Sequence, residues 1–149
     1  MSQPPAWADK FIGIPYKAFG RERSGADCWY FFCLVMREQF GVTLPTFDGV
    51  GYYGEGQSLE ISNEARRAIG QIMSDNKDAL WEKIPAGSER PGDGILLNMI
   101  GIPMHVGVVC APGLFLHCER GCDSCVERYT SGAWSRRIEG FYRYRSSAD

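Results

Sequence analysis

Residues 27–40 read DCWYFFCLVMREQF, and this stretch decides the fold. The run is apolar on nearly every side until Arg37, and Gly41 follows its last residue. A run of this length, closed by charged residues and a glycine, predicts a central buried helix. Asp27 is a favourable helix-capping residue, so we expect Cys28 in the first turn.

At that position Cys28 could act as a nucleophile. The N-terminus of a helix carries a partial positive potential, which favours the thiolate over the thiol. Gly25 permits a sharp turn before the helix that would expose the sulfur. Free cysteines are also often buried as small apolar side chains. Position alone therefore leaves a structural role for Cys28 equally open.

Short strands are predicted in the C-terminal half of the chain. They follow the turn at residues 91–93 (PGD) and cover residues 94–99, 106–110, 114–117, 126–129 and 138–144. Before them, residues 62–73 space apolar side chains as a helix does, and residues 48–57, with four glycines, indicate a loop that could form one wall of a cleft. Helices followed by strands indicate an α+β fold with an antiparallel sheet.

The chain has two histidines, His105 and His117, which begin and end two neighbouring predicted strands. A histidine on a strand is more often structural than catalytic, so their relative position matters. If the connecting loop has an odd number of residues, such as residues 111–113, both imidazoles share one face of the hairpin. His117 then lies opposite Gly107, or opposite His105 if the turn comes one residue earlier. A loop of even length would separate the two rings.

These residues form the set that acyl transfer through a thioester requires. Cys28 would be the nucleophile, His105 the general base and His117 the residue that orients the base.

Four segments resemble the NlpC-type peptidases, a papain-like family of cysteine hydrolases. Residues 15–20 (PYKAFG) and 25–28 (GADC) are similar to the approach to the family's nucleophile. The turn at 91–93, residues 104–108 (MHVGV) and residues 114–117 (LFLH) are similar to its turn, its base-bearing strand and its third catalytic residue. The resemblance covers about residues 16–144. It implies a papain-like fold with helices packed on an antiparallel sheet, in a single domain over residues 1–149.

The resemblance also implies roles for individual residues. Cys28, His105 and His117 would be catalytic, Tyr16 would border the active site, and Asp27 and Trp29 would contribute to substrate binding. The implied activity is that of a cysteine peptidase that cleaves amide bonds in peptidoglycan stem peptides, without a cofactor. One departure is Tyr30, which stands where family members commonly have glycine. We therefore expect a pocket of altered shape beside the thiol.

A narrower resemblance concerns residues 27–29 (DCW) and 40–45 (FGVTLP), which are similar to the branch found in bacteriophages and prophages. That branch implies a role in the virion or its tail, with tail proteins as partners. The alternative function is a catalytically weak or inactive tail assembly protein that keeps the fold. Tyr30 favours this alternative, whereas the presence of Cys28, His105 and His117 together favours the enzyme.

Three further cysteines, Cys118, Cys122 and Cys125, follow His117 closely. Their spacing is that of [4Fe-4S] radical enzymes, but the 24 residues after Cys125 are too few for the barrel such enzymes need. With His117 they would also offer three sulfurs and one nitrogen to zinc. The remaining interpretation is a surface loop whose thiols are exposed by chance or paired on oxidation. We expect no bound metal, because His117 must be free to hydrogen-bond the base.

Composition and charge exclude several other classes. With 149 residues, 44% hydrophobic and 23% charged, the chain is of ordinary globular type. Its net charge of −2 predicts no nucleic-acid ligand, and the arginines at 136, 137, 143 and 145 are interpreted as solvated surface. Residues 1–10 lack the features of a secretion signal, and no apolar run reaches 18 residues. We expect cytoplasmic synthesis with free thiols, no membrane association, and the virion tail as a further location.

Overall fold

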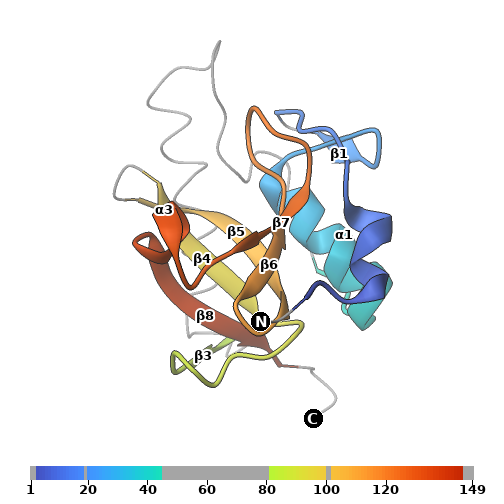
Figure 1. Ribbon diagram of the computed structural model, residues 1–149. Coiled ribbons are helices and arrows are strands. Elements are labelled where there is room, and N and C mark those ends of the chain that lie inside the picture. Colours follow the sequence, from blue (N-terminus) through green and yellow to red (C-terminus); the bar gives the residue numbers. More distant parts are fainter. Residues whose placement is uncertain (1–2, 19, 45–80, 100–101, 146–149) are drawn as a thin grey trace.

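The computed structural model describes residues 3–18, 20–44, 81–99 and 102–145. In this part of the chain a long helix packs against one face of a six-stranded antiparallel sheet (Figure 1). The predicted α+β class is therefore confirmed. The predicted loop at 48–57 and the predicted helix at 62–73 lie outside the described residues. None of the helices in these described ranges has the length and apolar character needed to cross a membrane.

Helix α1 (Cys28–Phe40) begins and ends as predicted. The carboxylate of Asp27, its N-cap, accepts a hydrogen bond from the backbone N–H of Tyr30 at 2.8 Å. Gly41 ends the helix in the left-handed conformation, with φ of 69°. Most of the helix surface is buried, because the sheet covers one side and the short 3-10 helix η1 (Ala6–Phe11) lies along another (Figure 1).

The sheet has the strand order β3-β8-β4-β5-β6-β7, with every pair antiparallel. Its strands are β3 (Trp81–Ile84), β4 (Gly94–Met99), β5 (Ile102–Ala111), β6 (Leu114–His117), β7 (Cys125–Arg128) and β8 (Ile138–Tyr144). The predicted bounds of β4, β6 and β8 agree with the structure, and those of β5 and β7 differ by one to four residues at an end. Sequence patterns did not predict strand β3 or the short helix α3 (Gly132–Ser135). They also missed a two-stranded hairpin before α1, which is formed by β1 (Arg21–Glu22) and β2 (Gly25–Ala26).

The two faces of the sheet are packed differently. On one face Val106, Val108 and Leu116 join the core cluster that contains α1. On the other face Val109 and Phe115 join a second cluster beneath the Trp134 ring of α3. Side chains alternate between faces along a strand, so His105, Gly107 and His117 belong to the second face.

The turn between β5 and β6 differs from the predicted loop. Ala111 pairs with Leu114, so the connection has two residues, an even number that by itself would place the two histidines on opposite faces. A β-bulge between Val109 and Ala111 adds one residue to β5, and Val108 then pairs with Leu116. The bulge thus restores the register in which His117 is level with Gly107, and both imidazoles share a face.

Gly107 is required at this point by close packing rather than by backbone conformation. A Cβ atom there would lie 2.6 Å from a ring carbon of Phe115 and 2.7 Å from the carbonyl oxygen of Leu116. Neither neighbour can move away easily, because both belong to the buried strand β6. The absence of a side chain lets β6 approach β5 beside His117.

Gly107→Ala should therefore lower the free energy of unfolding by about 1–3 kcal/mol, the usual cost of overpacking. Urea denaturation measures this loss. The control is Gly140→Ala in β8, where the new Cβ would meet the movable end of the Lys83 side chain at 2.8 Å. Equal stability losses in the two variants would contradict the close-packing explanation.

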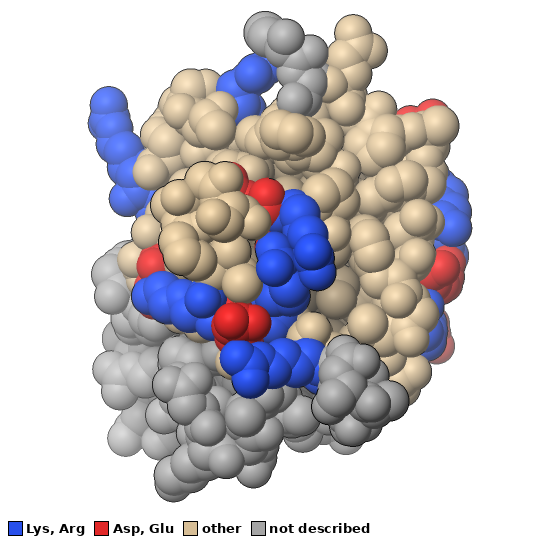
Figure 2. Space-filling view, turned by 90° about the horizontal axis from the view of Figure 1, so that it is seen from below, with Lys and Arg blue, Asp and Glu red and all other residues tan. Residues whose placement is uncertain are grey.

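Charged side chains on the face of the molecule near β3 and β8 alternate in sign. Figure 2, a view from below, shows blue Lys and Arg groups there beside red Asp and Glu groups. Arg145 lies 3.5 Å from Glu82, and the guanidinium of Arg143 holds both oxygens of Asp93 at 2.8 Å. Asp93 is buried and also accepts from the backbone N–H of Arg90. Arg143 is therefore a structural residue that fixes the turn at 91–93, which corrects its interpretation as solvated surface.

Candidate active site

Cys28 is the first residue of α1, and its side chain is fully buried. The helix begins at the end of the sheet where β5 starts and β6 finishes (Figure 1). A direct contact fixes this arrangement, because the thiol of Cys118, next after β6, donates to the carbonyl oxygen of Ala26 at 3.5 Å. The helix also packs against β5, the strand of His105. The structure thus brings the start of α1 and both histidines to one end of the fold.

Asp27 positions the start of α1. Its carboxylate is fully buried, with one oxygen on the Tyr30 N–H and the other paired with Arg21 from β1. Both carboxylate oxygens of Asp27 thus have partners within the fold, and its predicted role in substrate binding stays a prediction. The hairpin of β1 and β2, which the sequence patterns missed, supplies the balancing charge.

Trp29 lies in the core of the domain. Its ring is fully buried and stacks on Phe32, with a centroid distance of 5.6 Å. The second residue of α1 thus faces the core, and its predicted role in substrate binding stays a prediction. Tyr16 is half-buried and forms an isolated β-bridge with Ala26, so it lies beside the start of α1 as the resemblance implies. Tyr30 packs against the core cluster that includes Cys28.

The two imidazoles meet as strand parity requires. Nε2 of His105 lies 2.8 Å from Nδ1 of His117, and both rings are buried. His105 is placed next to a second bulge, because Leu97 pairs with His105 while Asn98 pairs with Pro103. Bulges of this kind change the direction of a side chain at a strand end.

A third residue continues the chain of hydrogen bonds. Nε2 of His117 lies 2.6 Å from Oε2 of Glu127, which also accepts from the indole N–H of Trp134 at 3.0 Å. Glu127 lies on β7, where Phe115 pairs with Glu127 and His117 pairs with Cys125. The carboxylate is therefore diagonal to His117 on the same face of the sheet.

This chain determines which ring nitrogens carry protons. The hydrogen bond from His117 lowers the pKa of the Glu127 carboxyl, so the group is ionised and can only accept. His117 must then carry its proton on Nε2, which leaves Nδ1 to accept a hydrogen bond from the Nε2–H of His105. The lone pair of His105 is consequently on Nδ1.

The surroundings keep His105 neutral. Burial lowers the pKa of His105 well below the ordinary value of 6.5, and the nearby His117 and Arg137 lower it further. The Trp134 ring stacks on the imidazole at 5.5 Å, and the Arg137 guanidinium lies over the Trp134 ring at 5.4 Å. A neutral imidazole with a directed lone pair is the form that acts as a general base.

Glu127 and Trp134 were not recognised as site residues from the sequence. The sequence did contain a signal for Glu127. Seven residues separate His117 from Cys125, an odd number, so odd-numbered residues of the next strand share the face of His117. The three cysteines drew attention to the same loop as a metal motif instead. Trp134 had no such signal, because α3 is four residues long and reaches the histidines only through the folded chain.

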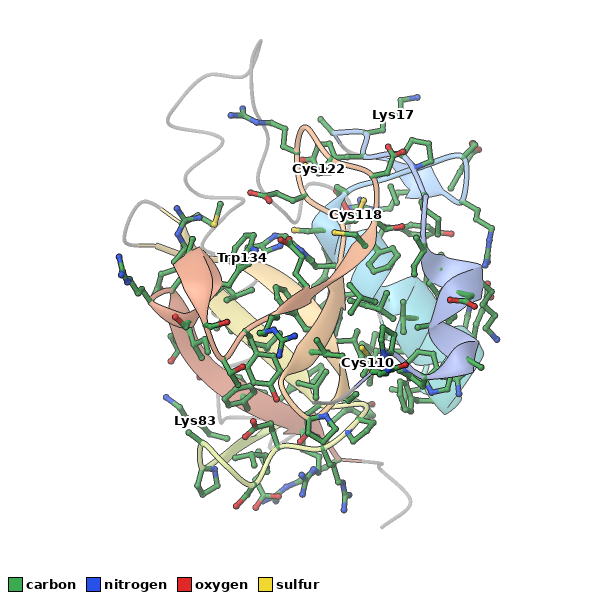
Figure 3. All side chains as sticks on the ribbon, in the orientation of Figure 1. Lys17, Lys83, Cys110, Cys118, Cys122 and Trp134 are labelled. Atoms are coloured by element: carbon green, nitrogen blue, oxygen red, sulfur yellow. The ribbon has the colours of Figure 1, made fainter. Side chains whose placement is uncertain are left out.

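The cysteine loop is anchored by Ser124. Ser124 is buried, accepts from the Ile14 N–H at 2.8 Å and donates to the carbonyl oxygen of Phe11. Cys118 is buried, and burial raises the pKa of its thiol to about 12. Cys122 is exposed at the outer part of the loop, away from Cys118 (Figure 3). Among the described residues, the predicted zinc set of three cysteines and His117 does not converge, and Cys118 is buried where a surface loop would expose its thiol.

Comparison with known proteins decides the family. The model of the NlpC/P60 family matches residues 13–143. The chain belongs to the NlpC/P60 family. It thereby joins a family of cysteine peptidases and peptidoglycan hydrolases, and the family part of the sequence resemblance is confirmed.

Solved structures of this family share the fold of the NlpC/P60 chain described here. The NlpC/p60 domain of the peptidoglycan hydrolase SagA is 20% identical, with a TM-score of 0.59 over 94% of both chains. An NlpC/P60 family protein from Bacillus cereus is 18% identical and NlpC2 from Trichomonas vaginalis is 14% identical, each with a TM-score of 0.59. The chain spans only 41% and 44% of those two proteins. None of the curated proteins compared with the chain matches it.

The depressed pKa of His105 predicts a pH dependence of stability. Below pH 6.5 the unfolded chain binds a proton at His105 that the folded chain does not, so stability falls as the pH falls from about 6.5. Between pH 7.5 and 5.5 this group should remove about 1.4 kcal/mol. Chemical denaturation in metal-free buffer at both pH values measures the loss. In His105→Gln, the loss of unfolding free energy between the two pH values should be smaller than in the wild type by that amount. An equal loss in the two proteins would contradict a neutral buried His105.

Proposed function

We propose that this NlpC/P60 protein is a cysteine peptidase that hydrolyses amide bonds in peptidoglycan stem peptides through a thioester. Cys28 is the nucleophile, His105 the general base and His117 the residue that orients the base. The observation that carries the proposal is the line of hydrogen bonds from Glu127 through His117 to His105, at the end of the sheet where α1 begins. Glu127 is added to the predicted site as a positioning residue.

The proposed reaction uses His105 as base and then as acid. Nδ1 of His105 accepts the proton of the Cys28 thiol while the sulfur attacks the amide carbonyl carbon. The resulting imidazolium gives that proton to the leaving amine, which breaks the C–N bond and leaves a thioester. Water, deprotonated by His105, then attacks the thioester and releases the acid and the thiol. His117, backed by the Glu127 carboxylate, stabilises the positive charge that develops on His105.

The proposed substrate rests on the family. SagA, which shares the fold, is described as a peptidoglycan hydrolase, and peptidoglycan peptides supply amide bonds of the kind this chemistry cleaves. At 20% identity the likeness to SagA concerns the fold alone. The bond that is cleaved is a matter for product analysis.

A location in a phage or prophage tail, with tail proteins as partners after cytoplasmic synthesis, is a further part of the proposal. It rests on the resemblance of residues 27–29 and 40–45 to that branch of the family. The alternative, an inactive tail assembly protein of the same fold, would give no reason for a buried histidine pair held by a carboxylate. Polar groups of this kind are costly to bury and are retained at functional sites.

Digestion of purified peptidoglycan tests the activity. We expect the wild-type protein to release new free amino groups from stem peptides, identified by mass spectrometry of the products. Cys28→Ala should release none while unfolding at about the wild-type denaturant concentration. Equal product from both proteins would refute the role of Cys28, and no product from either would favour the inactive alternative.

The same assay ranks the positioning residues. His117→Gln keeps an amide oxygen that can accept from His105, so it should retain more activity than His117→Ala, whereas His105→Gln should lose nearly all of it. Glu127→Gln should lower kcat roughly tenfold to a hundredfold with little change in KM, because it removes charge stabilisation of the imidazolium but no substrate contact. An unchanged kcat in Glu127→Gln would remove Glu127 from the site.

A further inference from the structure

Three groups that can bind a metal ion converge on the outer side of the histidine pair. Nε2 of His117, Sγ of Cys125 and Oε2 of Glu127 all lie within 4.8 Å of one another. The sulfur is 3.8 Å from the nitrogen and 3.9 Å from the oxygen, and the nitrogen and oxygen are 2.6 Å apart. One nitrogen, one sulfur and one oxygen donor form a set that suits a borderline-soft divalent cation.

This set differs from the one that the cysteine spacing indicated. The Cys118 thiol points to the other face of the sheet, where it contacts the carbonyl oxygens of Ile14 and Ala26. Cys122 lies at the outer part of the loop (Figure 3). Cys125 is the cysteine that β-pairing places directly opposite His117, and strand geometry brings Glu127 to the same face.

The three donors need only small shifts to hold a tetrahedral zinc ion. With ordinary bond lengths, the nitrogen and oxygen would be about 3.3 Å apart and the sulfur about 3.5 Å from each. The His117–Glu127 contact would open by roughly 0.7 Å and the contacts to sulfur would shorten by roughly 0.3 Å. The Glu127 side chain is 42% exposed, so it can move and an ion can approach from solvent. The Trp134 N–H would remain a partner that orients the carboxylate.

Charged groups of both signs lie near the three donors. The carboxylates of Glu119 and Glu127 act on the Cys125 thiol, and Glu119 also acts on His117. Two guanidinium groups have the opposite sign: Arg137 acts on His105 and Glu119, and Arg120 acts on Glu119. Zinc binds cysteine as the thiolate, so binding at Cys125 releases the thiol proton.

We propose that His117, Cys125 and Glu127 bind one Zn²⁺ ion reversibly, and that the bound ion inhibits the peptidase. The binding half stands on the geometry above, and the inhibitory half rests on the proposed function. The ion is an inhibitor of the site and takes no part in the proposed reaction.

Inhibition follows from the protons of the two imidazoles. Zinc occupies Nε2 of His117, so the ring proton of His117 must reside on Nδ1 and point at Nε2 of His105. His105 then carries its own proton on Nδ1, the nitrogen that receives the Cys28 proton in the proposed reaction. Both rings keep one proton, and the proton released on binding comes from the Cys125 thiol. The base is thus blocked without any change at Cys28.

Binding is tested in Cys28→Ala, which removes the Cys28 thiol as a competing ligand and needs no turnover. Titration calorimetry with Zn²⁺ should give one ion per chain, and Co²⁺ should give a near-ultraviolet sulfur-to-metal charge-transfer band. Adding Cys125→Ser should weaken Zn²⁺ binding by more than about tenfold and abolish the band. Adding Cys122→Ser is the matched control and should leave both unchanged. Absence of binding in Cys28→Ala, or its loss with Cys122→Ser alone, would overturn the site.

Inhibition is tested in the otherwise wild-type chain, with each protein compared with its own zinc-free rate. Zn²⁺ at a concentration that saturates the site should abolish the hydrolysis of peptidoglycan, and Cys125→Ser should need at least about tenfold more Zn²⁺ for the same loss. Saturated binding with an unchanged rate would overturn the inhibitory half and leave the binding half standing. A protein that binds Zn²⁺ but never hydrolyses peptidoglycan would instead refute the proposed function.

Discussion

The hydrogen bond between Nε2 of His105 and Nδ1 of His117 is the interaction on which the site depends. Two buried imidazoles at 2.8 Å can share only one proton between the facing nitrogens, so the tautomer of each ring fixes that of the other. The Glu127 carboxylate, an acceptor from His117, decides which of the two arrangements forms. The lone pair consequently appears on Nδ1 of His105.

Several parts of the fold serve this contact. The bulge between Val109 and Ala111 corrects the parity of a two-residue turn, and Gly107 leaves room for β6 beside the histidines. The Cys118 thiol and the buried Ser124 hydroxyl connect the end of β6 and the following loop to the segment before α1. The Cys28 end of the helix and the histidine end of the sheet are thereby held together by short-range contacts. The same contacts explain why this loop contains buried polar groups.

Much of the fold could be predicted from the chain, because helix and strand patterns depend on local sequence. The capping residue Asp27, the apolar run after it and Gly41 define α1, and alternation defines β4, β6 and β8. The contact between the two histidines was predicted from an odd number of residues in the loop between β5 and β6. The loop has an even number, and the bulge between Val109 and Ala111 compensates for the difference. Roles that depend on which way a side chain faces were less accessible. Trp29 and Asp27 flank Cys28 in sequence, yet their side chains face different ways. The Trp29 ring packs in the core, and the Asp27 carboxylate caps its own helix. The partners that complete the site, Glu127 and Trp134, come from elements whose placement follows from tertiary structure.

Nitrogen-15 NMR of the imidazole rings tests the central claim most directly, because the chain has two histidines and their signals can be assigned by substitution of either one. In metal-free Cys28→Ala, we expect a proton on Nε2 of both rings and a lone pair on Nδ1 of His105. Glu127→Leu, which removes the acceptor, should allow the proton of His117 to move to Nδ1 and that of His105 to follow. A proton on Nδ1 of His117 in the protein that retains Glu127, or tautomers that do not respond to Glu127→Leu, would contradict the account.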